Sequence, residues 1–144
     1  MKTSPDQDPH GLSELIAGVN RRLDTAVEAR LKPAGARIEQ YRLLASLMRQ
    51  DGQAMGELAP SVFVDLPTLT KIVDRMVAAG LVYRAPDARD RRRVLVFLSD
   101  KGRAHFGELS PLVESERRVV TEGLSDSETA RLSELLRGIL ADRQ

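Results

Sequence analysis

The side chains best suited to chemistry in this sequence are arginines gathered at one place. Residues 84–93, "RAPDARDRRR", contain five arginines and two aspartates. Residues 66–93 carry seven Lys/Arg against three Asp/Glu, a charge of +4, whereas residues 105–144 carry five against eight, a charge of −3. Guanidinium groups bind phosphate oxygens and are attracted to the negative potential of a narrow minor groove. Because the whole chain has a formal charge of only +1, the basic centre indicates a polyanionic partner.

The sequence offers little for catalysis or metal binding. It has no cysteine, which excludes thiol catalysis, disulfides, peroxide sensing through a thiol and cysteine-bound zinc. Its two histidines, His10 and His105, are far apart and lack carboxylates at metal-ligand spacing. No phosphate-binding glycine loop or nucleophile motif occurs. We therefore expect no enzyme, no cofactor and no metal site.

The length and the apolar pattern limit the classes of protein to which this chain can belong. A chain of 144 residues is long enough for one compact domain. No apolar run approaches the roughly 20 residues that cross a bilayer, and the first ten residues lack the apolar segment of a signal peptide. We expect a cytoplasmic protein.

The arginines lie at the tip of a predicted β-hairpin. The runs "LVYR" and "VLVFL", which flank them, are β-branched and aromatic, as strands prefer. Ahead of the hairpin, the pattern predicts a short helix around Met55–Ser61, a turn, and a longer helix from Leu66 to Ala79. A hairpin directly after a helix-turn-helix is a winged helix arrangement.

The longer helix has clear end signals. Asp65 is a predicted N-cap, and Pro67 lies in the first turn, where its missing N–H costs little. Gly80 supplies a left-handed C-cap, which lets Leu81 fold back onto the helix. The predicted buried stripe consists of Leu69, Ile72, Val73, Met76 and Val77.

With that stripe buried, the opposite face of this helix can meet DNA. The second helix of a helix-turn-helix lies in the major groove, where short hydroxyls suit phosphates and lysine suits a phosphate or a guanine edge. An ordinary solvated face would have the same composition, but the projecting arginines favour DNA binding by helix and hairpin together. The alternative is a winged helix whose basic wing binds an acidic protein partner. The candidate residues on the helix are Thr68, Thr70, Lys71 and Arg75.

Helices are predicted on both sides of the winged helix. An apolar stripe runs from Leu12 to Val27, and a second helix follows from about Arg37 to Arg49. A long helix is expected from about Asp100 to Glu122, and "SDSE" at Ser125–Glu128 is a capping box that begins the last helix. The fold class is therefore mainly α with a small β-hairpin. The apolar seam of the last helix is Leu132, Leu135, Leu136, Ile139 and Leu140.

The central run "ELAPSVFVDLPTLTKIVDRMVAAGLVYRAPDARDRRRVLVFLSDKGR" resembles the core of the MarR family of winged helix-turn-helix transcription regulators. The wing carries the pattern D-x-R-D-x-R, and "LSDKGR" follows it. The resemblance implies a single domain over residues 1–144. Within it, about 37–100 would form the DNA-binding lobe, and about 11–33 and 100–142 a helical dimerisation region. The matching wing positions are Asp87, Arg89, Asp90 and Arg92.

The resemblance implies a sequence-specific, double-stranded DNA-binding regulator that acts as a ligand-responsive homodimeric repressor on a palindromic operator. The first and last helices of two chains would interlock and hold the two winged helices apart. The implied interface residues are Leu12, Leu15, Leu132, Leu136, Ile139 and Leu140.

The resemblance also implies roles within the wing. Asp90 would pair with Arg75 and tie the wing to the recognition helix, while Arg92, with Arg89, would enter the minor groove. Arg91 would serve phosphates or solvent. Asp87 is expected to cap the turn, because aspartate accepts hydrogen bonds from nearby backbone N–H groups.

Members of the family often release DNA when a small anionic or aromatic molecule binds between the dimer helices and the winged domain. In this chain Asn20, Arg21, Arg37 and Tyr41 are the implied pocket residues, although surface charge or a partly buried tyrosine is the simpler description of each one alone. The chain also departs from the family, with Phe63 where glycine is frequent in the turn. Pro60 is expected to distort or shorten the short helix.

Overall fold

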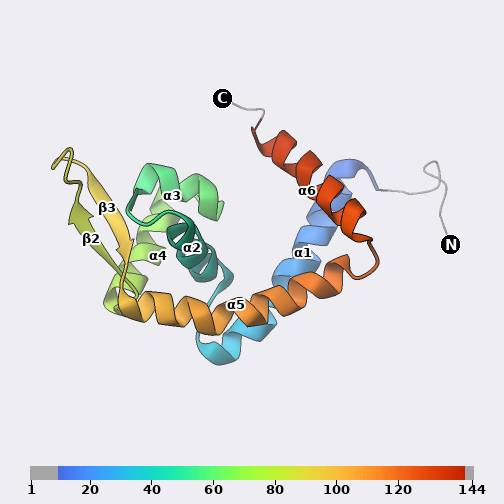
Figure 1. Cartoon of the computed structure of the whole chain (residues 1–144), viewed down its shortest axis with the longest axis horizontal. Coiled ribbons are helices and arrows are strands. Elements are labelled where there is room, and N and C mark those ends of the chain that lie inside the picture. Colours follow the sequence, from blue (N-terminus) through green and yellow to red (C-terminus); the bar gives the residue numbers. More distant parts are fainter. Residues whose placement is uncertain (1–9, 142–144) are drawn as a thin grey trace.

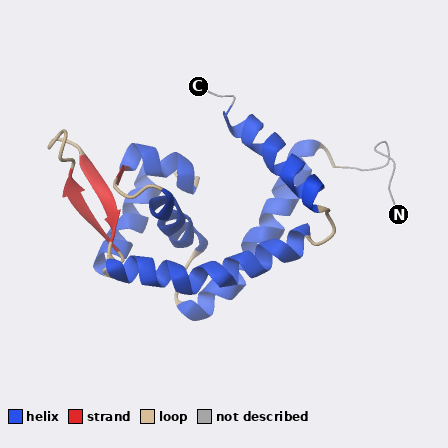
Figure 2. Cartoon of the chain, in the orientation of Figure 1, coloured by secondary structure: helices blue, strands red, loops and turns tan. Residues whose placement is uncertain are grey.

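The computed structural model describes residues 10–141, which form six α-helices and one small sheet (Figures 1 and 2). The mainly helical fold with a β-hairpin is confirmed. Helix α5 runs from the foot of the hairpin to the region where α1 and α6 lie, so it connects the two ends of the molecule. The helices are α1 (Leu12–Leu31), α2 (Ile38–Arg49), α3 (Met55–Val62), α4 (Leu66–Ala78), α5 (Asp100–Thr121) and α6 (Asp126–Ala141). The strands are β1 (Gln53–Ala54), β2 (Val82–Pro86) and β3 (Val94–Leu98).

The hydrophobic core lies in the lobe formed by α2, α3, α4 and the sheet. Helix α2 is central to it, and its residues Leu43, Leu44 and Leu47 are completely buried. The C-terminal end of α1 adds Leu31 to this core, and α5 adds Leu109. Burial of these side chains fixes both long helices to the lobe, because removing apolar surface from water is the main favourable contribution to folding.

The sheet has three antiparallel strands in the order β1-β3-β2, one strand more than the hairpin that the sequence predicts. Gln53 pairs with Val96, and Val82 pairs with Leu98. The sequence predicts no strand at residues 53–54, because two residues are too few for a β-pattern to stand out. The buried Gln53 side chain holds β1 in place, since its Nε2 donates to the carbonyl oxygens of Ser46 (3.0 Å) and Gln50 (2.7 Å).

The predicted helix caps are confirmed. Asp65 Oδ1 accepts from Thr68 N–H at 2.8 Å, and the capping box of α6 forms both bonds, with Ser125 N–H to Glu128 Oε1 at 3.0 Å and Glu128 N–H to Ser125 Oγ at 3.1 Å. Gly80 has φ of 75°, and the N–H of Leu81 bonds to the Met76 carbonyl at 2.9 Å. Local side-chain chemistry thus sets where α4 begins and ends and where α6 begins.

Pro60 does not shorten helix α3, which was one of the two effects expected of it. The helix continues to Val62, since Leu58 and Val62 are both completely buried and hold its apolar side against the core. It ends at Phe63, whose φ of 63° and ψ of 39° lie in the left-handed region. The N–H groups of Phe63 and Val64 both bond to the carbonyl of Ala59.

The apolar side chains at the far end of the molecule remain uncovered. Helix α6 has no buried residue within the described part of the chain, and the N-terminal half of α1 is exposed throughout. The six residues implied at a dimer interface are 40% to 70% exposed: Leu12, Leu15, Leu132, Leu136, Ile139 and Leu140. Over residues 10–141, no helix is both long enough and apolar enough to cross a membrane.

Candidate nucleic-acid interface and effector cleft

Helix α4 presents the predicted polar face to solvent. Thr68, Thr70, Lys71 and Arg75 are all exposed, while the opposite face of the helix is buried in the core. The Thr70 hydroxyl donates to the Leu66 carbonyl at 3.0 Å. Hydrogen bonds from the side chain and then the N–H of Thr68 lower the pKa of Asp65, so its carboxylate occupies the N-terminus of the helix. The N–H of Thr68 is therefore not available to a phosphate.

The wing tip is a closed turn held by its two aspartates. The backbone bonds Asp87 N–H to Arg93 O (2.8 Å) and Arg93 N–H to Asp90 O (2.9 Å) close the loop. Asp87 Oδ1 accepts from Arg89 N–H at 2.9 Å, as expected of a turn cap, and Asp90 Oδ1 accepts from Arg92 N–H at 3.2 Å. Both aspartates thus stabilise the turn through hydrogen bonds to its backbone. The side chains of Arg89 and Arg91 are exposed, and that of Arg92 is 93% exposed.

The wing is attached to the helix-turn-helix by different residues from those expected. Among the described residues no ion pair joins Asp90 to Arg75; Asp90 instead lies 3.4 Å from Arg92 Nε. Its carboxylate is directed into the turn by the Arg92 N–H, and this explains the difference. Arg84 of β2 pairs with Asp74 of α4 at 2.5 Å.

A second ion pair joins the other side of the wing to α3. Arg93, the last residue of the wing tip, pairs with Glu57 in the first turn of α3. No local sequence signal predicts either attachment, because each pair spans elements whose approach depends on the fold. The wing is therefore tied at two points, one on each strand side.

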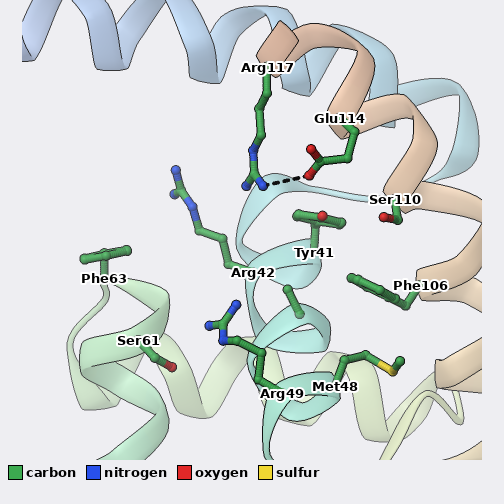
Figure 3. Close-up of a pocket in the computed structure, with 11 residues that line it drawn as sticks. Tyr41, Arg42, Met48, Arg49, Ser61, Phe63, Phe106, Ser110, Glu114 and Arg117 are labelled. Carbon is green, nitrogen blue, oxygen red and sulfur yellow. Dashed lines mark hydrogen bonds and ion pairs between the residues drawn. The ribbon is translucent and has the colours of Figure 1, made fainter. Parts of the chain in front are cut away.

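An open cleft of about 400 Å³ lies between α2, the end of α3 and α5 (Figure 3). Tyr41 and Phe106 stack on its α5 side, with ring centroids 5.6 Å apart. The Arg117 guanidinium lies 5.6 Å from the centroid of the Tyr41 ring and 3.1 Å from Glu114 Oε1. This arrangement combines flat aromatic surface with positive charge, which suits an aromatic anion.

Two further arginines of α2 line the same cleft. Arg42 is paired with Asp24 of α1 at 3.0 Å. Arg49, the last residue of α2, forms no ion pair within residues 10–141. Their spacing of seven residues places them on one helix face, and this is the signal by which the sequence could have indicated the cleft.

Of the residues expected to form an effector pocket, the structure places only Tyr41 in this cleft. Arg37 is the N-cap of α2 and lines a separate cavity of about 210 Å³ beside Thr68 and Arg75. Asn20 and Arg21 are exposed on α1 and do not line the cleft. The first helix contributes less than expected because its buried residues lie only near its C-terminus.

Comparison with known proteins agrees with this architecture. A family model described as the MarR family matches residues 37–94. The multiple antibiotic resistance protein MarR of Escherichia coli (strain K12) is 33% identical over 130 residues, which cover 90% of this chain and 90% of that protein. The chain belongs to the MarR family. Its relatives are transcriptional regulators, and the family core covers α2, α3, α4, β2 and the wing tip.

Two solved structures of related proteins show the same fold. The crystal structure of a mutant MarR from Escherichia coli complexed with operator DNA has a TM-score of 0.80 and 31% identity, covering 96% of this chain and 99% of that chain. The crystal structure of CouR from Rhodococcus jostii RHA1 bound to p-coumaroyl-CoA has a TM-score of 0.86 and 24% identity, covering 99% of both chains.

Proposed function

We propose that this MarR-family transcriptional regulator represses genes as a homodimer that binds a palindromic operator in double-stranded DNA. One observation carries the proposal: α4, whose polar face is exposed, lies beside a hairpin whose projecting tip carries exposed arginines. A helix in the major groove places such a wing next to the adjoining minor groove. The likeness to a MarR protein crystallised on operator DNA supports the same use of these elements.

Each group of residues has a proposed role. Thr68, Thr70, Lys71 and Arg75 contact the major groove and its phosphates. Arg92 and Arg89 enter the minor groove, and Arg91 contacts the phosphate backbone. The exposure of all seven side chains supports this assignment. Arg93 is excluded from the set, because its guanidinium is paired with Glu57.

A second chain is proposed to cover the apolar faces of α1 and α6. Monomeric proteins rarely leave such a continuous row of large apolar side chains in water, and burying it provides the driving force for association. The DNA-binding lobe of residues 37–100 would then project from a helical dimerisation region of residues 11–33 and 100–142. A two-fold axis between the lobes requires two half-sites related by the same symmetry.

The cleft between α2, α3 and α5 is the proposed effector site. Its stacked rings and arginines suit a planar aromatic carboxylate or a related anion. The cleft is lined both by the end of α3, which leads into the recognition helix, and by α5, which leads to the dimer region. A bound anion would therefore contact the parts of the protein whose relative placement sets the spacing of the two lobes.

We propose no catalytic activity for this protein. A regulator of this kind acts in the cytoplasm, where the chromosome lies. The competing function is a winged helix that binds an acidic protein through its wing. Salt weakens both kinds of complex, so salt dependence alone does not separate them. Sequence preference for DNA does separate them.

The test begins with selection of bound duplexes from a random pool, followed by fluorescence anisotropy on the enriched sequence at fixed salt. We expect a palindrome to be enriched. Arg92→Ala should weaken its binding roughly tenfold and reduce the salt slope by about 1, as loss of a groove-bound arginine does. Arg131→Ala on α6 is the matched control and should bind as the parent does. Unchanged affinity in Arg92→Ala would contradict the role of the wing, and failure to enrich any sequence would favour the protein-binding alternative.

A further inference from the structure

Phe63 occupies a backbone conformation that its side chain disfavours. Its φ of 63° lies in the left-handed region, where a β-carbon crowds the following carbonyl and bulky residues are rare. The other positive-φ residues within the described chain are all glycines, at positions 35, 52 and 80. Strain of this kind persists where the surrounding structure or the function requires the residue.

Burial does not explain why a phenyl ring occupies this position. The Phe63 side chain is 66% exposed, so it contributes little to the core. It lines the effector cleft on the α3 side, facing Arg42, while Tyr41 and Phe106 stand on the other side (Figure 3). The cleft thus has aromatic surface on both of its walls.

The backbone of Phe63 is part of the junction between the two helices of the helix-turn-helix. Its N–H bonds to the Ala59 carbonyl at the end of α3. The next N–H, that of Val64, bonds to the same carbonyl at 3.2 Å. Asp65, which caps α4, follows directly. A displacement of Phe63 is therefore transmitted over two residues to the start of the recognition helix.

We propose that Phe63 couples the effector cleft to DNA binding. Its ring forms one wall for a planar aromatic carboxylate, whose acid group pairs with Arg49, the cleft arginine with no ion pair inside residues 10–141. Stacking of the ligand on Phe63 shifts the turn and with it the recognition helix, which lowers operator affinity. This inference rests on the proposed effector site. Phe63 transmits ligand binding to the recognition helix and makes no contact with DNA itself.

The probes are 2-naphthoate and its saturated counterpart, decahydronaphthalene-2-carboxylate, titrated by calorimetry into the full-length protein. The parent chain should bind 2-naphthoate more tightly, because only the aromatic ring can stack. Phe63→Leu keeps the bulk and the left-handed strain but removes the ring. It should bind 2-naphthoate about 3- to 10-fold more weakly and lose the preference between the two probes.

Operator binding is then measured with and without 2-naphthoate. The readout is the loss of operator affinity on adding 2-naphthoate, which the parent chain should show and Phe63→Leu should not. Phe63→Gly removes both the ring and the strain, so it should lose the response in the same way while melting at a temperature no lower than that of the parent. This second variant keeps the test decisive if the leucine variant folds poorly.

Arg49→Ala separates failure of this inference from failure of the effector site. If Arg49→Ala binds 2-naphthoate weakly while Phe63→Leu binds it normally, the cleft stands and the role of Phe63 is overturned. If Phe63→Leu binds it weakly yet still releases DNA normally, the coupling is overturned. A parent chain that binds no 2-naphthoate contradicts both proposals.

Discussion

Asp74 on the recognition helix α4 forms an ion pair with Arg84 on the first wing strand β2, with 2.5 Å between Oδ1 and Nη2. The pair fixes the wing relative to the helix that we propose reads the major groove. Both side chains are partly exposed, so the pair adds little to global stability. Its importance lies in orientation, because a groove-binding element loses affinity when it must be ordered at the moment of binding.

Asp74→Asn distinguishes a positioning role of the ion pair from a simple effect of charge, because the two change operator affinity in opposite directions. Removing an acid next to bound DNA would strengthen binding if only net charge mattered. If the ion pair positions the wing, the same change weakens operator binding several-fold, as measured by anisotropy at fixed salt. Glu122→Gln, which removes one negative charge at the distant end of α5, is the control and should leave affinity unchanged. Tighter binding by Asp74→Asn would show that the wing needs no such attachment.

The second prediction concerns Gly102 in the first turn of α5. A β-carbon at this position would lie 2.0 Å from the carbonyl oxygen of Leu81, which accepts from Ser99 N–H. The Leu81 carbonyl belongs to the backbone and cannot move away from the new β-carbon without strain. Gly102→Ala should therefore lower the free energy of unfolding by about 1–3 kcal/mol. Urea denaturation measures this change in the free energy of unfolding. Gly107→Ala is the matched control on the same helix, because a β-carbon there meets nothing within 4 Å. It should be neutral or stabilising, since alanine favours helix, and equal effects of the two changes would refute the close packing.

The third prediction concerns the apolar face of α6. Leu136→Asp should convert the dimer to a monomer, because the interface would bury an unpaired charge. Light scattering measures the mass. Gly138→Asp adds the same charge on the opposite side of the helix, where a β-carbon has open space, and should remain dimeric. A dimer that survives Leu136→Asp would place the interface elsewhere.

The fourth prediction concerns pH and the cap of α4. The bonds from the Thr68 side chain and N–H hold the pKa of Asp65 below 3.8, its ordinary value. A lowered pKa in the folded state means that the ionised carboxylate stabilises the fold, and that this contribution is complete above pH 3.8 and is lost as the pH falls through the folded-state pKa. The stability gap between the parent chain and Asp65→Asn should therefore shrink in strong acid. A carboxyl titration followed by NMR should give a midpoint below 3.8, and a midpoint at or above it would contradict the cap.

The elements that the sequence predicts well are those set by local chemistry. The caps at Asp65, Gly80 and Ser125 and the β-branched runs around the arginines locate α4, the hairpin and α6, because each signal acts within a few residues. The two-residue strand β1 is not predicted, since its pairing partner β3 lies about 40 residues further along the chain.

The candidate site is predictable in part for the same reason. Exposure of the recognition face and the wing arginines follows from helical and strand periodicity. The attachments of the wing do not, because Asp90 satisfies its carboxylate locally while Asp74 and Glu57 meet their arginines only after the lobe has folded. Of the predicted pocket residues only Tyr41 lines the cleft, because three separate elements contribute its lining residues and their approach depends on the whole fold.

The central claim is that two winged helices, related by a two-fold axis, read one operator together. Its most direct test is the affinity of the parent chain for the selected palindrome and for variants whose half-sites are moved apart by about 5 or about 10 base pairs. An insertion of half a helical turn places the second half-site on the opposite face of the duplex. An insertion of a full turn returns it to the same face, one turn further along. We expect tight binding to the selected spacing and loss of most affinity after the half-turn insertion. Equal affinity for all three duplexes would contradict it.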